Sequence, residues 1–107
     1  MFSIADEAGY RDILPGIRMK TLVWGECTLM TEFRLEPGAS LPSHDHPHEQ
    51  TGYLVSGCLR LFIGDESRVI GPGDSWVIPG RTSHRAEAID SSVAVEVFSP
   101  VREDYLP

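Results

Sequence analysis

The chain has 107 residues, a length that suits one domain with its own hydrophobic core. A formal net charge of −7, with no Lys/Arg cluster to offset it, argues against a partner that is a nucleic acid. The acidic residues near the N-terminus argue against a signal peptide and no apolar run approaches membrane-spanning length, so we expect a cytoplasmic protein without a membrane partner.

Turn signals divide the chain into short stretches that alternate between apolar and polar residues, as β-strands do. An N-terminal arm over residues 1–16 has room for one short strand. The further predicted strands cover residues 19–24, 27–35, 50–56, 59–63, 68–70, 75–78, 82–89 and 93–98. Residues 50–56 and 59–63 are predicted to form a hairpin across Ser56–Gly57. Turns recur roughly every eight to twelve residues without a helical period, which is typical of an all-β sandwich or barrel.

Three of the four histidines lie in the stretch from Gly38 to Gly57, and the fourth is His84. In an extended backbone alternate side chains project to the same side, so His44 and His46 are predicted to share a face. Gln50 has the same parity, and His84 from a distant strand would complete three imidazoles and one oxygen. This donor set suits Mn, Fe, Ni, Cu or Zn, and without thiolates it argues against a closed structural zinc site. The alternative interpretation is a loop of surface histidines without a metal.

Two neighbours of these histidines are expected to stay outside the ligand set. His48 has the right parity, but Pro47 interrupts regular extension, so we expect His48 beside the ligands or facing solvent. Glu49 is expected to be a solvated side chain. Elsewhere, Cys27 and Cys58 match no CxxC spacing and are expected to be reduced, half-buried thiols.

The spacing Gly38-x5-His44-x-His46-x3-Gln50-x6-Gly57 resembles the first motif of the cupins, which usually have Glu where this chain has Gln50. Residues 73–84 (Gly-Asp-Ser-Trp-Val-Ile-Pro-Gly-Arg-Thr-Ser-His) resemble the second motif. Arg81 stands there where Gly is usual, and Ala88 follows where Asn is often found.

This resemblance implies the cupin double-stranded β-helix, a jelly-roll barrel, as a single domain over residues 1–107 with a C-terminal tail at 99–107. It implies that His44, His46, Gln50 and His84 bind a divalent transition metal. It also implies a homodimer, which would help to cover the sheet edges.

The last predicted strand, residues 93–98, carries an acidic residue in an apolar segment. Glu96 shares a face with Ala94 and Phe98, and three valines occupy the other face. Either that face is solvated, or Glu96 points into a polar cavity as an acid or base; we favour the cavity. Arg102 either folds back to hold a carboxylate in bidentate fashion or forms a salt bridge with Glu103 or Asp104.

The segments His-x-His-Pro-His-Glu-Gln and Glu96-Val-Phe98-Ser-Pro-Val-Arg102-Glu-Asp-Tyr105 resemble the pectin-degradation (KdgF-type) cupins, which open the ring of 4,5-unsaturated monouronates. The resemblance implies catalytic roles for Glu96, Phe98 and Arg102 and an anionic sugar as substrate. That family usually has Asp where this chain has Glu96. A metal-dependent dioxygenase that uses Fe or Mn, and a non-catalytic cupin that binds a sugar or small acid, stay open as alternatives.

Overall fold

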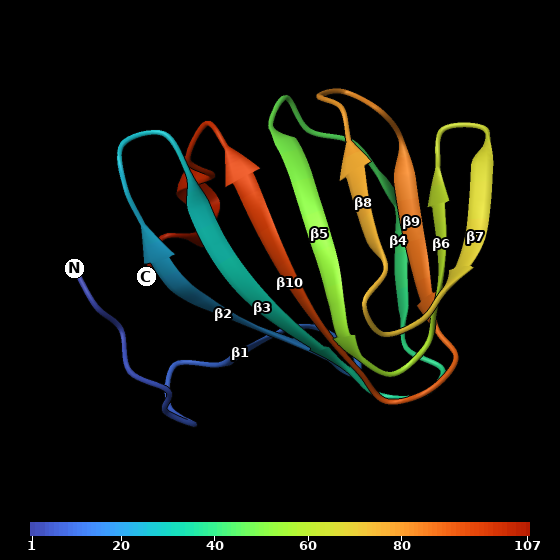
Figure 1. Cartoon of the computed structure of the whole chain (residues 1–107), viewed down its shortest axis with the longest axis horizontal. Coiled ribbons are helices and arrows are strands. Elements are labelled where there is room, and N and C mark those ends of the chain that lie inside the picture. The colour runs from blue at the N-terminus through green and yellow to red at the C-terminus, as the bar shows by residue number, and fades with distance from the viewer.

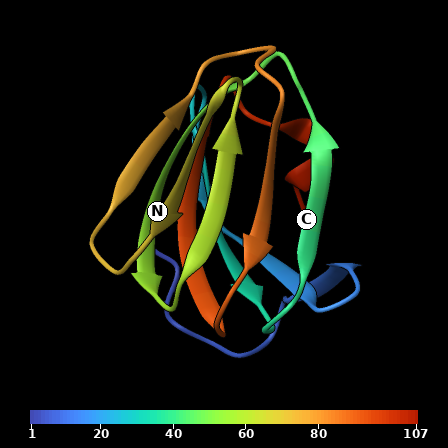
Figure 2. The ribbon, with the colours of Figure 1, turned by 90° about the vertical axis from the view of Figure 1, so that its right-hand side faces the viewer.

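Alternation of apolar and polar side chains gives strands that each turn one face inward, and ten such strands form two facing antiparallel sheets (Figures 1 and 2). The computed structural model covers all 107 residues. The six-stranded sheet has the order β1 (Arg11–Leu14), β2 (Ile17–Trp24), β3 (Leu29–Leu35), β10 (Ser92–Ser99), β5 (Glu49–Ser56) and β8 (Ser75–Ile78). The four-stranded sheet has the order β4 (Ser40–His44), β9 (His84–Ala88), β6 (Leu59–Ile63) and β7 (Glu66–Ile70).

The core lies between the two sheets, where side chains of both inner faces interdigitate. On β3 the predicted alternation is present: Leu29, Phe33 and Leu35 are buried, whereas Glu32 and Arg34 lie on the other face. Leu54 of β5 and Phe98 of β10 are among the most deeply buried side chains. The all-β prediction is therefore confirmed, and the two packed sheets form the expected jelly roll.

The predicted hairpin between residues 50–56 and 59–63 is wrong. β5 pairs with β10 and β8, whereas β6 pairs with β7 and β9, so the chain passes from one sheet to the other at residues 56–58. Gly57 makes this crossing with a φ of 97°, and a Cβ there would lie 2.3 Å from the Ser92 hydroxyl oxygen. The glycine signal therefore marks a change of sheet, and the hairpin of this region is β6–β7 instead.

The two ends of the chain behave differently. Residues before β1 lie outside the sheets and are mostly exposed (Figure 1). The C-terminal tail instead folds back through a 3-10 turn at Glu103–Tyr105. There the Tyr105 ring packs edge-on against Phe33 and Phe98, with centroids 6.2 and 5.4 Å away. The tail thus lies against the barrel close to the end of β10.

Two smaller observations complete the fold. Both cysteines are free, and Cys58 is partly buried, as expected. Cys27 was also expected to be half-buried, but it is exposed because it lies in the β2–β3 connection. None of the helical segments has the length and apolar character needed to cross a membrane.

Candidate metal and acid–base site

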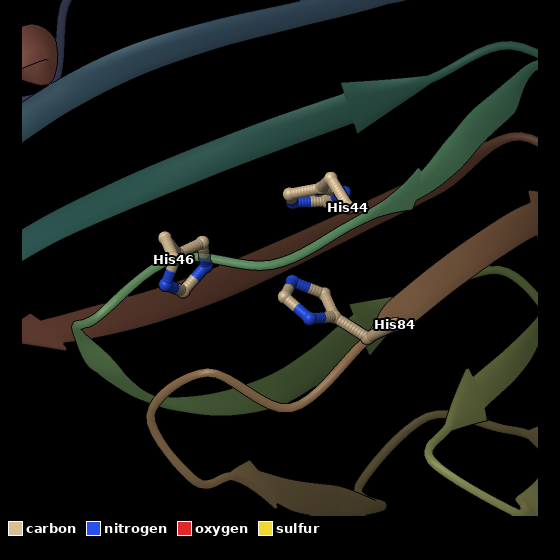
Figure 3. A group of neighbouring side chains, drawn as sticks. All are labelled: His44, His46 and His84. Carbon is tan, nitrogen blue, oxygen red and sulfur yellow. The ribbon is translucent and has the colours of Figure 1, made fainter.

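Three of the predicted ligands form a cluster of imidazoles, which we call the histidine cluster (Figure 3). His44 ends β4 and His84 begins β9, and the two residues are register partners. His46 lies in the loop that follows β4. One nitrogen from each ring lies within 4.8 Å of the other two. His44 and His46 point to the same centre, as predicted, although β4 ends at His44 and the following loop carries His46 there.

The backbone fixes which nitrogen of each ring faces the centre. Each Nδ1 lies beside a backbone carbonyl oxygen two residues away: Pro42 for His44 at 3.0 Å, His48 for His46 at 3.0 Å and Thr82 for His84 at 2.8 Å. A carbonyl only accepts hydrogen bonds, so each Nδ1 carries the proton and donates it. The Nε2 atom of each neutral ring is left with a free lone pair, which is the form that binds a metal.

Two observations at the centre of the cluster fit a bound cation. The Nε2 atom of His84 is buried and has no hydrogen-bond partner. The Nε2 atom of His46 lies 3.0 Å from the side-chain oxygen of Gln50, so two acceptor atoms face each other. Both arrangements are unfavourable without a positive charge nearby. The donor set of three imidazoles and one amide oxygen therefore fits a divalent transition metal.

Burial keeps two of the rings neutral. It lowers the pKa of His84 from 6.5 to about 4, with small further contributions from the neighbouring histidines. Burial also lowers the pKa of His46, and the positive charge of Arg102 adds to the effect. Neutral rings at pH 7 are ready to bind a metal because no proton must first be displaced.

Gln50 connects the histidine cluster to Glu96. It is buried on β5, in the opposite sheet from His44 and His84, and its amide group donates a hydrogen bond to the carboxylate of Glu96. This bond turns the amide oxygen toward His46. A glutamate at position 50 would place two carboxylates side by side, which disfavours the ionisation of both. An amide is the side chain that accepts on one side and donates on the other.

Glu96 lies on the inner face of β10 with Ala94 and Phe98. Its carboxylate oxygen Oε1 accepts a hydrogen bond of 3.1 Å from the indole N–H of Trp76. Together with Gln50 and His84, it borders an internal cavity of about 40 Å³. Burial raises the pKa of Glu96, and the hydrogen bonds from Gln50 and Trp76 partly oppose that rise. The structure thus places Glu96 at a cavity rather than on a solvated face, but apolar residues form most of the lining, whereas a polar cavity was expected.

Arg102 forms the tail salt bridge, which is one of the two interpretations left open by its sequence. Its Nε atom donates to the two carboxylate oxygens of Asp104, at 3.1 and 3.2 Å, which is the tail salt bridge. The guanidinium also lies 5.3 Å from the centroid of the Phe98 ring and 4.0 Å from that of Tyr105. The side chain is only 14% exposed. Since the salt bridge engages Nε alone, the two terminal nitrogens remain available to an anionic ligand.

The loop between β8 and β9, residues 79–83, contacts the histidine loop, which we define as residues 45–48 between β4 and β5. Arg81 has a φ of 62° and its backbone N–H donates to the carbonyl oxygen of His46 at 2.7 Å. A left-handed conformation explains why glycine is usual at this position. At Gly80 a Cβ would lie 2.5 Å from the carbonyl oxygen of Pro47, so the two loops are in direct backbone contact.

The remaining residues of the histidine loop lie outside the cluster. His48 is partly buried, and its contribution to the site is its backbone carbonyl, which holds His46. Glu49 is exposed, as expected. Trp76 was not singled out from the sequence; its position in the second cupin-like motif was the only available signal.

The three histidines differ in their exposure to solvent. His44 is partly exposed, whereas His46 and His84 are buried. The inner cavity of about 40 Å³ holds water-sized molecules and is far smaller than a typical ligand pocket. A ligand of sugar size therefore does not fit inside this cavity, and His44 is the most exposed of the three rings.

Comparison with known proteins places this geometry in a family. The family model described as Cupin domain matches residues 31–100. The pectin degradation protein KdgF of Dickeya dadantii is 28% identical over 107 residues, which cover 98% of this chain and 97% of that protein. The structure of KdgF from Halomonas sp. superposes with a TM-score of 0.94 and 34% identity, covering 99% of this chain and all of the other. An RmlC-like cupin from Shewanella frigidimarina superposes with a TM-score of 0.93 and 27% identity, covering 98% of this chain and 95% of that one.

Proposed function

The chain belongs to the cupin family, and from that premise we propose that it is a metal-dependent enzyme that opens the ring of 4,5-unsaturated monouronates formed when pectin is broken down. The likeness to the pectin degradation protein of Dickeya dadantii extends over almost the whole of both chains, which supports this substrate class.

The observation that carries the proposal is the convergence of three kinds of group around one cavity. The histidine cluster offers nitrogen lone pairs, Gln50 offers an amide oxygen, and Glu96 offers a carboxylate with a raised pKa. The guanidinium of Arg102 lies over Phe98 beside them. A Lewis-acid site, a proton acceptor and an anion-binding group are the parts that opening of an unsaturated sugar acid requires.

In the proposed complex Arg102 binds the substrate carboxylate through its two terminal nitrogens, while Asp104 keeps hold of Nε. The ring of Phe98 is buried beneath the guanidinium and supports it, and a substrate held by Arg102 would direct its anomeric hydroxyl toward Glu96. A metal held by His44, His46, His84 and Gln50 would supply Lewis acidity that stabilises negative charge on the ring oxygen as its bond to C1 breaks.

The protons and electrons balance within the substrate. Glu96 removes the proton from the hydroxyl on C1, the C1–O bond of the ring breaks, and C1 becomes an aldehyde. The electron pair goes to the former ring oxygen, which leaves an enolate over C4 and C5. Glu96 then returns the proton to C4, and C5 becomes a ketone. A carboxyl group with a raised pKa suits a group that both accepts and returns a proton.

The test follows the ultraviolet absorbance of a 4,5-unsaturated galacturonate, whose double bond is lost on ring opening and ketonisation. We expect the protein to accelerate the loss above the spontaneous rate, a chelator to abolish the acceleration, and a divalent metal to restore it. If metal-loaded protein gives no acceleration, the proposal is wrong and the cupin assignment is unaffected.

The matched variants are Glu96→Gln and Glu49→Gln. Both remove one carboxylate from the same pair of neighbouring strands, but Glu49 is exposed. We expect Glu96→Gln to lower kcat by about a hundredfold or more with its metal content intact, and Glu49→Gln to behave like the wild type. Wild-type turnover in Glu96→Gln would remove Glu96 from the mechanism.

A further inference from the structure

Three residues on neighbouring strands form a row across the inner face of the six-stranded sheet. On β5, Gly52 is the register partner of Glu96 on one side and of Trp76 on the other. Register partners project to the same face of a sheet. The order across the sheet is therefore an acidic residue, a residue without a side chain, and a tryptophan.

The missing side chain at Gly52 is what allows the outer two to meet. Adjacent strands lie about 4.8 Å apart, so Glu96 and Trp76 begin about two strand spacings from each other. The indole of Trp76 lies over Gly52, where a Cβ would be only 2.1 Å from its ring. From there its N–H reaches Oε1 of Glu96 at 3.1 Å. Any other residue at position 52 would occupy the space of the indole.

We propose that Trp76, seated over Gly52, is a positioning residue that fixes the orientation of the Glu96 carboxylate for proton transfer. The inference rests on the proposed function of Glu96 as acid and base. An indole N–H only donates, so it holds Oε1 as an acceptor and fixes the plane of the carboxylate.

Trp76 also separates Glu96 from solvent. Trp76 also borders a surface groove of about 310 Å³ that lies between β8 and the β6–β7 hairpin. The same side chain borders the inner cavity that contains the Glu96 carboxylate. The indole thus forms the wall between the groove and the cavity. A phenylalanine at this position would keep the wall and remove only the hydrogen bond, which separates the two effects.

The first experiment observes the contact itself and needs no substrate. The chain has two tryptophans, and Trp24 is 51% exposed, so Trp24→Phe leaves Trp76 as the single indole. In this background the indole N–H resonance of the nitrogen-15-labelled protein is expected to move upfield when Glu96→Gln removes the charged acceptor. An unchanged resonance would overturn the inference, whether or not the protein opens uronates.

The second experiment measures the consequence of losing the contact. We expect Trp76→Phe to lower kcat by about tenfold or more, the effect of losing a hydrogen bond to a charged group, with KM and metal content within about twofold. A change in KM alone, or no change, would overturn the positioning role.

A glycine pair provides the matched control. Gly52→Ala is expected to displace the indole, shift its N–H resonance and lower kcat as Trp76→Phe does. Gly25→Ala adds the same methyl group where nothing lies within 4 Å, and is expected to change neither. If Gly52→Ala leaves the resonance and kcat at wild-type values, Gly52 does not make room for the indole and the inference fails.

Discussion

The two halves of the candidate site are built on opposite sheets and by different means. The histidine half takes His44 and His84 from the four-stranded sheet, with His46 from the adjoining loop, and each ring is held by a backbone carbonyl two residues away. The acid–base half takes Gln50 and Glu96 from the six-stranded sheet. It is held by contacts between side chains of different strands, such as the hydrogen bond from Trp76 on β8 to Glu96 on β10.

Burial acts on both halves and favours neutral groups in each. It lowers the pKa of His84 and His46, because a buried ring resists gaining a positive charge. It raises the pKa of Glu96, because a buried carboxyl resists gaining a negative one. The difference is that neutral imidazoles are ready ligands, whereas the carboxylate needs donors, which Gln50 and Trp76 provide. The following predictions test this division.

The largest expected effect comes from removing one ring of the histidine half. His84→Ala should lower metal affinity by about a hundredfold or more, since even the loss of a supporting contact to a ligand costs 10–100-fold. Metal content after dialysis, measured by mass spectrometry, checks this. His48→Ala is the matched control in the loop that carries His46: it keeps the carbonyl that holds His46, so metal content should be unchanged. Loss of metal in His48→Ala alone would reverse the assignment of the two residues.

The next effect concerns the stability of the metal-free protein. Because the pKa of His84 is about 4 in the folded protein and 6.5 when unperturbed, the unfolded chain binds a proton that the folded protein does not. The free energy of unfolding in chelator should therefore be highest above pH 6.5. It should fall by up to about 3 kcal/mol as the pH drops to about 4. Denaturant titrations at several pH values measure it.

A matched variant isolates this contribution. The glutamine in His84→Gln cannot titrate in this range. The free energy of unfolding of the variant should therefore fall less with decreasing pH than that of the wild type, and the difference between the two proteins gives the contribution of His84. Parallel curves for the two proteins would show that the acid sensitivity comes from other groups.

A smaller effect is expected in the acid–base half when Gln50 becomes glutamate. Gln50→Glu removes a donor from Glu96 and adds a like charge, so the pKa of Glu96 should rise further. The acidic limb of the kcat profile should move to higher pH by about one unit, with about a tenfold loss of kcat below it. Thr51→Glu adds the same charge on the exposed face of β5 and should leave the profile in place. A profile that moves equally in both variants would indicate a general charge effect.

The division between the halves also explains what the sequence could predict. His44 and His46 could be singled out as candidate ligands because they are close in the chain, and His84 because it ends the second cupin-like motif. The strands followed from alternation, as on β3. The crossing between sheets at Gly57 was mistaken for a hairpin, because a glycine at a turn gives the same sequence signal whether the next strand joins the same sheet or the other one. The contact of Trp76 with Glu96 could not be predicted, because it depends on the register of three strands that are distant in sequence.

The smallest predicted effect lies where the two loops meet. Arg81 adopts a left-handed φ of 62°, a conformation that costs a residue with a Cβ about 1–2 kcal/mol. Glycine avoids this strain, but it loses more conformational entropy on folding, which costs roughly 0.5–1 kcal/mol. Arg81→Gly should therefore raise the free energy of unfolding by about 0.5 kcal/mol, measured by denaturant titration. Metal content should be unaffected, because the hydrogen bond to His46 comes from the backbone. Arg81→Ala removes the side chain but keeps the strain, so a gain in stability seen equally in both variants would contradict the backbone explanation.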